Sequence, residues 1–160
     1  MGKIPEEIVR FFKKRNFVIV STIGSNGIPH SSCKGLVKIT GYGKLYIMDL
    51  YKGNTHRNLK KNSRMSITAV DEDSFTGYCL KGSAKIVKRD KLSPSILRAW
   101  RKMLVRRISQ RLIKSIHGEK GHPAHPEAAL PRPEYLIVME LRKIVDLAPH
   151  PETYRKKINE

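Results

Sequence analysis

The sequence predicts a mainly β protein with flanking helices, in which about six antiparallel strands form a small closed or split barrel. The longest apolar stretches, 17–20 and 135–139, are strand-sized and rich in β-branched residues. Glycine-containing turns join the early strands, which favours antiparallel pairing. A sheet of this size must either close on itself or expose its edge strands, and we favour closure because it leaves no unpaired edge.

The length of 160 residues predicts one domain spanning 1–160. No apolar run approaches the roughly 20 residues that a membrane-spanning helix needs. The segment 1–7 contains no apolar signal region, and the two cysteines lack the spacing of a metal site or a disulfide scaffold. We therefore expect a reduced, cytoplasmic protein.

The first half of the chain reads as a helix followed by three strands. A short amphipathic helix is predicted at 5–15, because Pro5 suits the first helical position and Glu6 and Glu7 favour the positive end of the helix dipole. Turn signals at Gly24–Gly27 and Gly41–Gly43 then separate the strands. The predicted strands are 17–23, 29–40 and 44–49.

The second half of the chain contains two helical segments between the remaining strands. The polar segment 53–62 has helical composition, and a long helix is predicted at 94–117. A loop rich in proline and histidine, 117–133, precedes the last strand. The predicted strands are 64–71, 77–88 and 134–147.

The charge of the chain is unusual for a globular protein. It has 32 lysines and arginines against 14 acidic residues, which gives a net charge of +18. Such a protein attracts phosphates, nucleic acids and anionic membranes through a general field. The field alone does not distinguish one bound phosphate from a polymer of phosphates.

The helix 94–117 concentrates much of this charge. It carries a stripe of apolar residues at helical spacing, in which Trp100 is most simply a core anchor. Three interpretations remain open for its basic side: a solvated surface, a binding surface for nucleic acid or anionic membrane, or a rim that steers an anionic substrate. From residue 91 to residue 117 there is no acid, and the basic residues are Lys91, Arg98, Arg101, Lys102, Arg106, Arg107, Arg111 and Lys114.

The junction 49–59 is a candidate anion site. A strand ends near Asp49, Gly53 lies in the loop that follows, and a helix begins near Asn54 and Thr55. The first backbone N–H groups of a helix have no helical partners, and the helix dipole is positive at this end. An ordinary helix cap would explain the same residues, so spacing alone does not decide between the two interpretations.

Three segments together resemble the pyridoxamine 5′-phosphate oxidase-like family of FMN-binding split barrels. They are the strand 17–22 with its turn and the following Pro29-His30-Ser31-Ser32, the stretch 54–67, and the stretch 77–84, in which Gly82 is followed by a small residue. The final strand 135–146 fits more loosely. The resemblance implies a split-barrel fold, an FMN cofactor and a homodimer with the flavin at the subunit interface.

The resemblance also implies positions for the cofactor. Asn54 and Thr55 fall where the family binds the FMN phosphate. Four residues of the second strand fall along the flavin ring and ribityl chain, and two residues fall at the end of the third strand beside the ring. These six residues are Ser31, Ser32, Cys33, Lys34, Met48 and Asp49.

Departures from the family pattern argue against a true pyridoxamine phosphate oxidase. Those oxidases carry a basic pair where this chain has Asn54-Thr55, and an arginine where it has Cys33. Lys34 or Arg57 could supply the missing charge. The sequence therefore predicts a flavoprotein that is a redox protein or a flavin-dependent oxidoreductase, and it does not settle whether the chain is an enzyme. Alternatives are a deazaflavin-dependent reductase, a haem-degrading member of the same superfamily, or a basic module that uses helix 94–117.

Catalytic and metal-binding residues are not predicted. His117, His122 and His125 could ligate zinc or nickel, but the Pro- and Gly-rich loop gives them no fixed geometry. No nucleophile elbow, phosphate-binding P-loop or dinucleotide fingerprint is present in the sequence.

Overall fold

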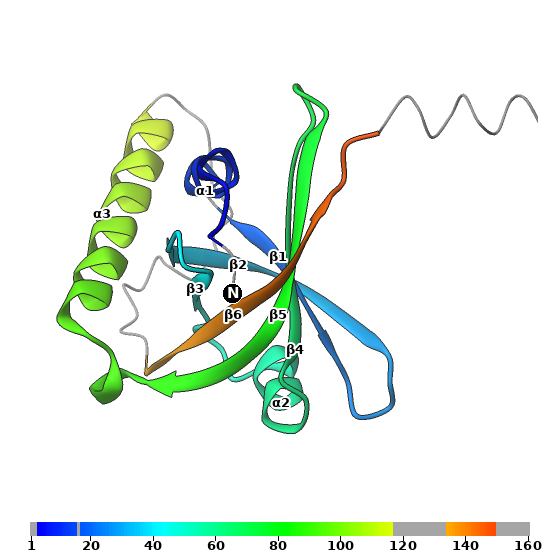
Figure 1. The fold of residues 1–160 in the computed structure, drawn as a ribbon. Helices are drawn as coiled ribbons and strands as arrows, with labels where there is room; N and C mark the ends of the chain where they lie inside the picture. The colour runs from blue at the N-terminus through cyan, green and yellow to red at the C-terminus, as the bar shows by residue number, and fades with distance from the viewer. Residues whose placement is uncertain (1–2, 16, 117–133, 150–160) are drawn as a thin grey trace, which may run out of the picture.

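Six antiparallel strands form a closed barrel in the computed structural model, which describes residues 3–15, 17–116 and 134–149 (Figure 1). The order around the barrel is β1–β2–β3–β6–β5–β4, and pairing of β1 with β4 closes it. This confirms the fold class predicted from the sequence. The strands are β1 (Val18–Ile23), β2 (Pro29–Ile39), β3 (Lys44–Met48), β4 (Arg64–Asp71), β5 (Thr76–Lys88) and β6 (Tyr135–Asp146).

Three α-helices accompany the barrel, and each was predicted within two residues of its observed ends. A short 3₁₀ turn at Arg89–Lys91, which was not predicted, precedes the last of them. The loop 117–133, with its three histidines, lies outside the described residues. The helices are α1 (Glu6–Lys13), α2 (Asn54–Lys61) and α3 (Pro94–Ile116).

Side chains from every strand fill the interior of the barrel. Residues at every second position, such as Val18 and Val20 of β1, are buried, as alternation along a strand requires. Phe12 of α1 and Leu59 of α2 join the same apolar cluster. In Figure 1, α1 lies above the crossing point of the strands and α2 lies below it. The barrel therefore leaves no internal space for a large planar ligand.

A second apolar cluster holds α3 against the outside of the barrel. Trp100 is 5% exposed and contacts Met48 and Leu136, and its indole N–H donates to the Met48 sulfur at 2.9 Å. Figure 1 shows α3 standing beside the barrel. Trp100 is thus a core anchor, as the apolar stripe indicates. Among the helices of the described ranges, none has the length and apolar character of a membrane span.

A β-bulge interrupts the pairing of β5 with β6. Lys81 pairs with Lys143, but the next residue, Gly82, pairs with Leu141, so Arg142 is the extra residue of the bulge. A Cβ atom on Gly82 would lie 2.1 Å from the carbonyl oxygen of Glu140. The close approach of the two backbones at the bulge therefore requires glycine.

Replacing Gly82 with alanine should destabilise the protein, because the new methyl group cannot fit without separating β5 from β6. We expect Gly82→Ala to lower the free energy of unfolding by about 2 kcal/mol or more. Gly41→Ala is the matched control, since no atom lies within 4 Å of a Cβ at Gly41. Urea denaturation of both variants measures the difference, and equal stability would contradict the argument.

Candidate functional site

A buried carboxylate at the end of β3 contacts the middle of β2 and the start of β6. Asp49 directly follows β3, and its residue is 2% exposed. The Lys34 ammonium of β2 lies 2.7 Å from one carboxylate oxygen, and the Tyr135 hydroxyl of β6 donates to the other at 2.8 Å. Burial, followed by the bond to Asp49, raises the pKa of Tyr135 above its usual range. Both oxygens of the buried charge therefore have partners, as a stable buried carboxylate requires.

Polar contacts dock α2 onto the barrel. The Thr55 hydroxyl lies 3.0 Å from the Ser32 hydroxyl of β2, and the Asn58 amide donates to the Thr22 hydroxyl of β1 at 3.0 Å. Thr22 and Thr55 are each 2% exposed. These contacts fix the first two turns of α2 against β2 and β1.

His56 lies on α2 beside the carboxylate cluster. Its ring centroid is 5.0 Å from that of Tyr135. Burial, and then the nearby Lys60, lower the pKa of His56, while Asp49 opposes the shift. A lowered pKa means that the imidazole is neutral near pH 7. The positive charge around α2 consequently comes from its lysines and arginine.

A basic groove of about 570 Å³ runs between α2 and the β1–β2 turn. Asn54 lines it, and its side-chain oxygen accepts a hydrogen bond from Arg57. Gly53 precedes the helix, no side chain caps the helix, and its first turn contains no acid. The remaining basic residues that line the groove are His30, Lys60 and Lys61. The arrangement suits an anion that contacts the first turn of α2.

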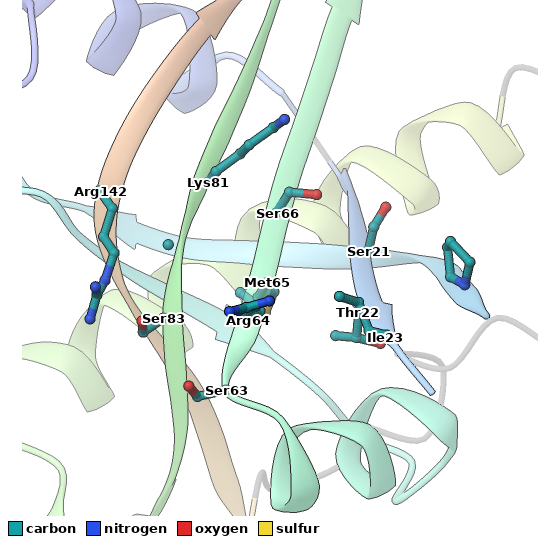
Figure 2. Close-up of a pocket in the computed structure, with 12 residues that line it drawn as sticks. Ser21, Thr22, Ile23, Ser63, Arg64, Met65, Ser66, Lys81, Ser83 and Arg142 are labelled. Atoms are coloured by element: carbon teal, nitrogen blue, oxygen red, sulfur yellow. The ribbon is translucent and has the colours of Figure 1, made fainter. Parts of the chain in front are cut away.

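A second groove, of about 620 Å³, lies on the outer surface of the sheet (Figure 2). It crosses β1, β4, β5 and β6, and none of the cofactor residues proposed from the sequence lines it. Its polar lining consists of hydroxyl and basic side chains. They are Ser21, Thr22, Ser63, Arg64, Ser66, Lys81, Ser83 and Arg142.

The cofactor residues proposed from the sequence do not share one surface. Ser31 and Cys33 are exposed on the opposite face of β2 from Ser32 and Lys34, and the Ser31 hydroxyl lies 2.8 Å from that of Ser21. Met48 is buried beneath Trp100 in the second apolar cluster. The structure brings together Ser32, Lys34, Asp49 and Thr55, with Asn54 next to them at the start of α2.

Sequence reasoning missed two groups of polar residues. Tyr135 donates a hydrogen bond to the second oxygen of Asp49. A tyrosine at the start of an apolar strand is a weak signal of a polar site, because tyrosine also favours strands. The sequence signal for the outer groove is clearer. Two strands each carry a pair of polar residues two positions apart, Arg64 with Ser66 and Lys81 with Ser83. That spacing places each pair on one face of its strand.

The closed six-stranded antiparallel barrel, with the helix that follows β3 in sequence docked against β1 and β2, defines the split-barrel class of protein. The sequence profile of pyridoxamine 5′-phosphate oxidase matches residues 4–131. The chain therefore belongs to the pyridoxamine 5′-phosphate oxidase-like family. No curated protein sequence matches it.

Solved structures with the same fold include HupZ of Group A Streptococcus, with a TM-score of 0.61, 17% identity, and coverage of 91% of this chain and 94% of HupZ. HutZ, the haem storage protein of Vibrio cholerae, gives a TM-score of 0.52, 15% identity, and coverage of 89% and 94%. An F420 reductase gives a TM-score of 0.54, 14% identity, and coverage of 91% and 98%. At these identities the similarity establishes the fold. Within the described residues, no cluster of three or more histidines, cysteines or acids could hold a metal ion.

Removing the charge of Lys34 should destabilise the protein strongly, because Asp49 would remain buried without its cation. We expect Lys34→Met to lower the free energy of unfolding by about 3 kcal/mol or more. Lys52→Met is the control, since the ion pair of Lys52 with Glu134 is exposed and contributes little. If both variants unfold at the same urea concentration, the buried pair does not have the structural role assigned here.

Proposed function

We propose that this chain is an FMN-binding flavoprotein with a redox function, and that the FMN phosphate binds at the first turn of α2. One observation carries the proposal. The first turn of α2 has neither a capping side chain nor an acid, and it opens onto a groove with several basic residues. Membership of the pyridoxamine 5′-phosphate oxidase-like family supports the same cofactor.

The chemistry of the first turn fits a phosphate. Its free backbone N–H groups need acceptors, and the helix dipole favours an anion there. Gly53 has no Cβ that would hinder close approach. Arg57 can supply a charge-assisted hydrogen bond, because its partner Asn54 is neutral. Lys34 forms an ion pair with Asp49. We therefore assign the positive charge that the oxidases' basic pair supplies to Arg57 and not to Lys34.

The residues around Asp49 would position this site. Lys34 and Tyr135 hold the end of β3, from which the loop to α2 departs. Ser32 holds Thr55 and thereby the first turn. FMN, when bound, supplies the transfer of one or two electrons, and the protein supplies its position and surroundings. The absence of the oxidases' basic pair at Asn54-Thr55 distinguishes this chain from the true pyridoxamine phosphate oxidases.

A homodimer with the flavin at the subunit interface is part of the proposal. Side chains fill the barrel, so a planar ring has to lie outside it, and a partner subunit would cover its second face. Exposed apolar residues such as Ile19 and Ile28 provide contact area for a partner. We also propose a cytoplasmic location.

A second candidate function rests on α3. Arg98, Arg101, Lys102 and Arg106 are exposed on this helix. Lys102 and Arg106 also line a groove of about 330 Å³ together with Lys13 and Lys38. This basic surface would suit nucleic acid or an anionic membrane. An absorbance spectrum of the purified protein, before and after addition of FMN, separates the candidates: a flavin, a deazaflavin and a haem absorb differently, whereas a nucleic-acid module binds none of them.

Thr55 provides the test of the phosphate site. Removing its hydroxyl in Thr55→Ala should weaken FMN binding about ten- to a hundredfold, as loss of a charge-assisted hydrogen bond of about 1.5–3 kcal/mol predicts. Thr55→Ser keeps a hydroxyl and should bind FMN nearly as well as the wild type. Riboflavin, which lacks the phosphate, should bind all three proteins equally. Fluorescence titration measures each affinity.

The riboflavin comparison separates two roles of Thr55. Its hydroxyl already contacts Ser32, so the substitution could instead loosen the docking of α2. Loosening would weaken FMN and riboflavin alike. That result would assign Thr55 a structural role and leave the phosphate site without this donor.

The oligomeric state tests the interface. If the flavin is shared between two subunits, light scattering of the FMN-loaded protein should give about 37 kDa, twice the 18.3 kDa of the chain. A flavin-loaded particle with the mass of one chain would refute the shared site.

A further inference from the structure

We propose that the exposed basic side of α3, together with the groove between α3 and α1, binds double-stranded nucleic acid through its phosphate backbone. A nucleic-acid partner rests on the second candidate function proposed for α3, and it does not depend on a bound flavin. The residues of this α3 basic surface are Arg98, Lys102 and Arg106 of α3, Lys13 of α1 and Lys38 of β2.

One row of cations runs along α3. Arg98, Lys102 and Arg106 are exposed and follow one another at intervals of four residues. Residues four apart lie on the same side of a helix, about 6 Å apart along its axis. The row therefore spans about 12 Å, over which one strand of a duplex presents about three or four phosphates.

A groove of about 330 Å³ extends this row away from α3. Lys102 and Arg106 line it from α3, whereas Lys13 lines it from α1 and Lys38 lines it from β2. Figure 1 shows the two helices next to each other, outside the barrel. The phosphates of a duplex lie on ridges between its grooves. A concave surface with cations on both sides fits such a ridge better than it fits a flat bilayer.

The cations of the groove are available to an external anion. Four of the five cations that line it take part in no ion pair among the described residues. They are Lys13, Lys38, Lys102 and Arg106. The fifth, Arg15, pairs with Asp71 at 2.5 Å. The described residues that line the groove include no acid, so the backbone of a nucleic acid would relieve the repulsion among the four.

The apolar side of α3 is not available to a membrane. Ile96, Trp100 and Leu104 are buried in the cluster that joins α3 to the barrel. An amphipathic helix binds a bilayer by burying its apolar side among the lipids. Because the barrel already covers that side of α3, its basic side is left for a partner, and this favours nucleic acid over a membrane.

The exposed side chains indicate a duplex and not a single strand. Proteins that bind single strands stack the bases on aromatic side chains. On the described parts of α1 and α3, the large apolar side chains that are exposed are Val105 and Ile113, and neither is aromatic. Binding to the phosphates of a duplex needs no stacking and carries no sequence information. We therefore expect binding without sequence preference.

The α3 basic surface is separate from the residues assigned to the partner subunit. Helix α3 packs on Met48 of β3 and Leu136 of β6. Ile19 and Ile28, the apolar residues proposed to contact the partner, belong to β1 and to the turn after it. Dimer formation and duplex binding can therefore be tested independently.

Fluorescence anisotropy with a labelled DNA duplex of arbitrary sequence tests the proposal. The combined variant Arg98→Gln, Lys102→Gln and Arg106→Gln removes three phosphate contacts. Each contact contributes about 0.9 to the salt exponent of the affinity, so the exponent should fall by about 2.7. In about 0.1 M salt the affinity should fall by two to three powers of ten.

Two further variants complete the experiment. Lys13→Gln with Lys38→Gln alters the opposite side of the groove and should lower the salt exponent by about 1.8. The matched control replaces three exposed lysines that do not line the groove, and it should bind the duplex nearly as well as the wild type. These lysines are Lys44, Lys85 and Lys88.

The outcomes separate the surface from the general field and from a membrane. Equal loss of affinity in the control would mean that net charge alone attracts the duplex, and would overturn the surface. A wild-type protein that binds phosphatidylserine vesicles but no duplex would also overturn it. FMN titration of the same samples is scored separately. Duplex binding without FMN binding would refute the flavin site alone, and FMN binding without duplex binding would refute the nucleic-acid surface alone.

Discussion

The buried carboxylate of Asp49 is the contact on which the region around α2 depends. It receives Lys34 from β2 and Tyr135 from β6, so one side chain ties together strands that are far apart in sequence. A buried charge is costly unless both of its oxygens are satisfied, and here they are. The loop that leads to α2 starts at this point. The position of the first turn of α2 therefore depends on an electrostatic contact as well as on apolar packing.

The filled interior of the barrel decides where ligands can bind. Because apolar side chains from all six strands occupy the inside, ligand sites have to lie on the outer surface. One groove follows the first turn of α2, and another lies between α1 and α3. Both are basic, but they differ in construction. The first uses a helix terminus, whereas the second uses side chains presented by two helices and a strand.

The effect of the net charge of +18 on ligand binding depends on where the basic side chains lie. Some basic residues neutralise acids, as Lys34 does for Asp49 and Arg15 does for Asp71. Others, such as Lys60 and Lys102, line grooves. A general field raises the local concentration of anions, and specific side chains then select among them.

The sequence by itself determined the order and type of the elements, because strand alternation, helical periodicity and glycine turns are local properties. It also identified the start of α2, whose signal lies within a few residues. Only the tertiary structure decided which side chains meet. It paired Lys34 with Asp49, buried Met48 against Trp100, and put Ser31 on the opposite face of β2 from Ser32. Such contacts depend on strand register and on the bulge at Gly82, and both arise from pairing between distant segments, which no local pattern specifies.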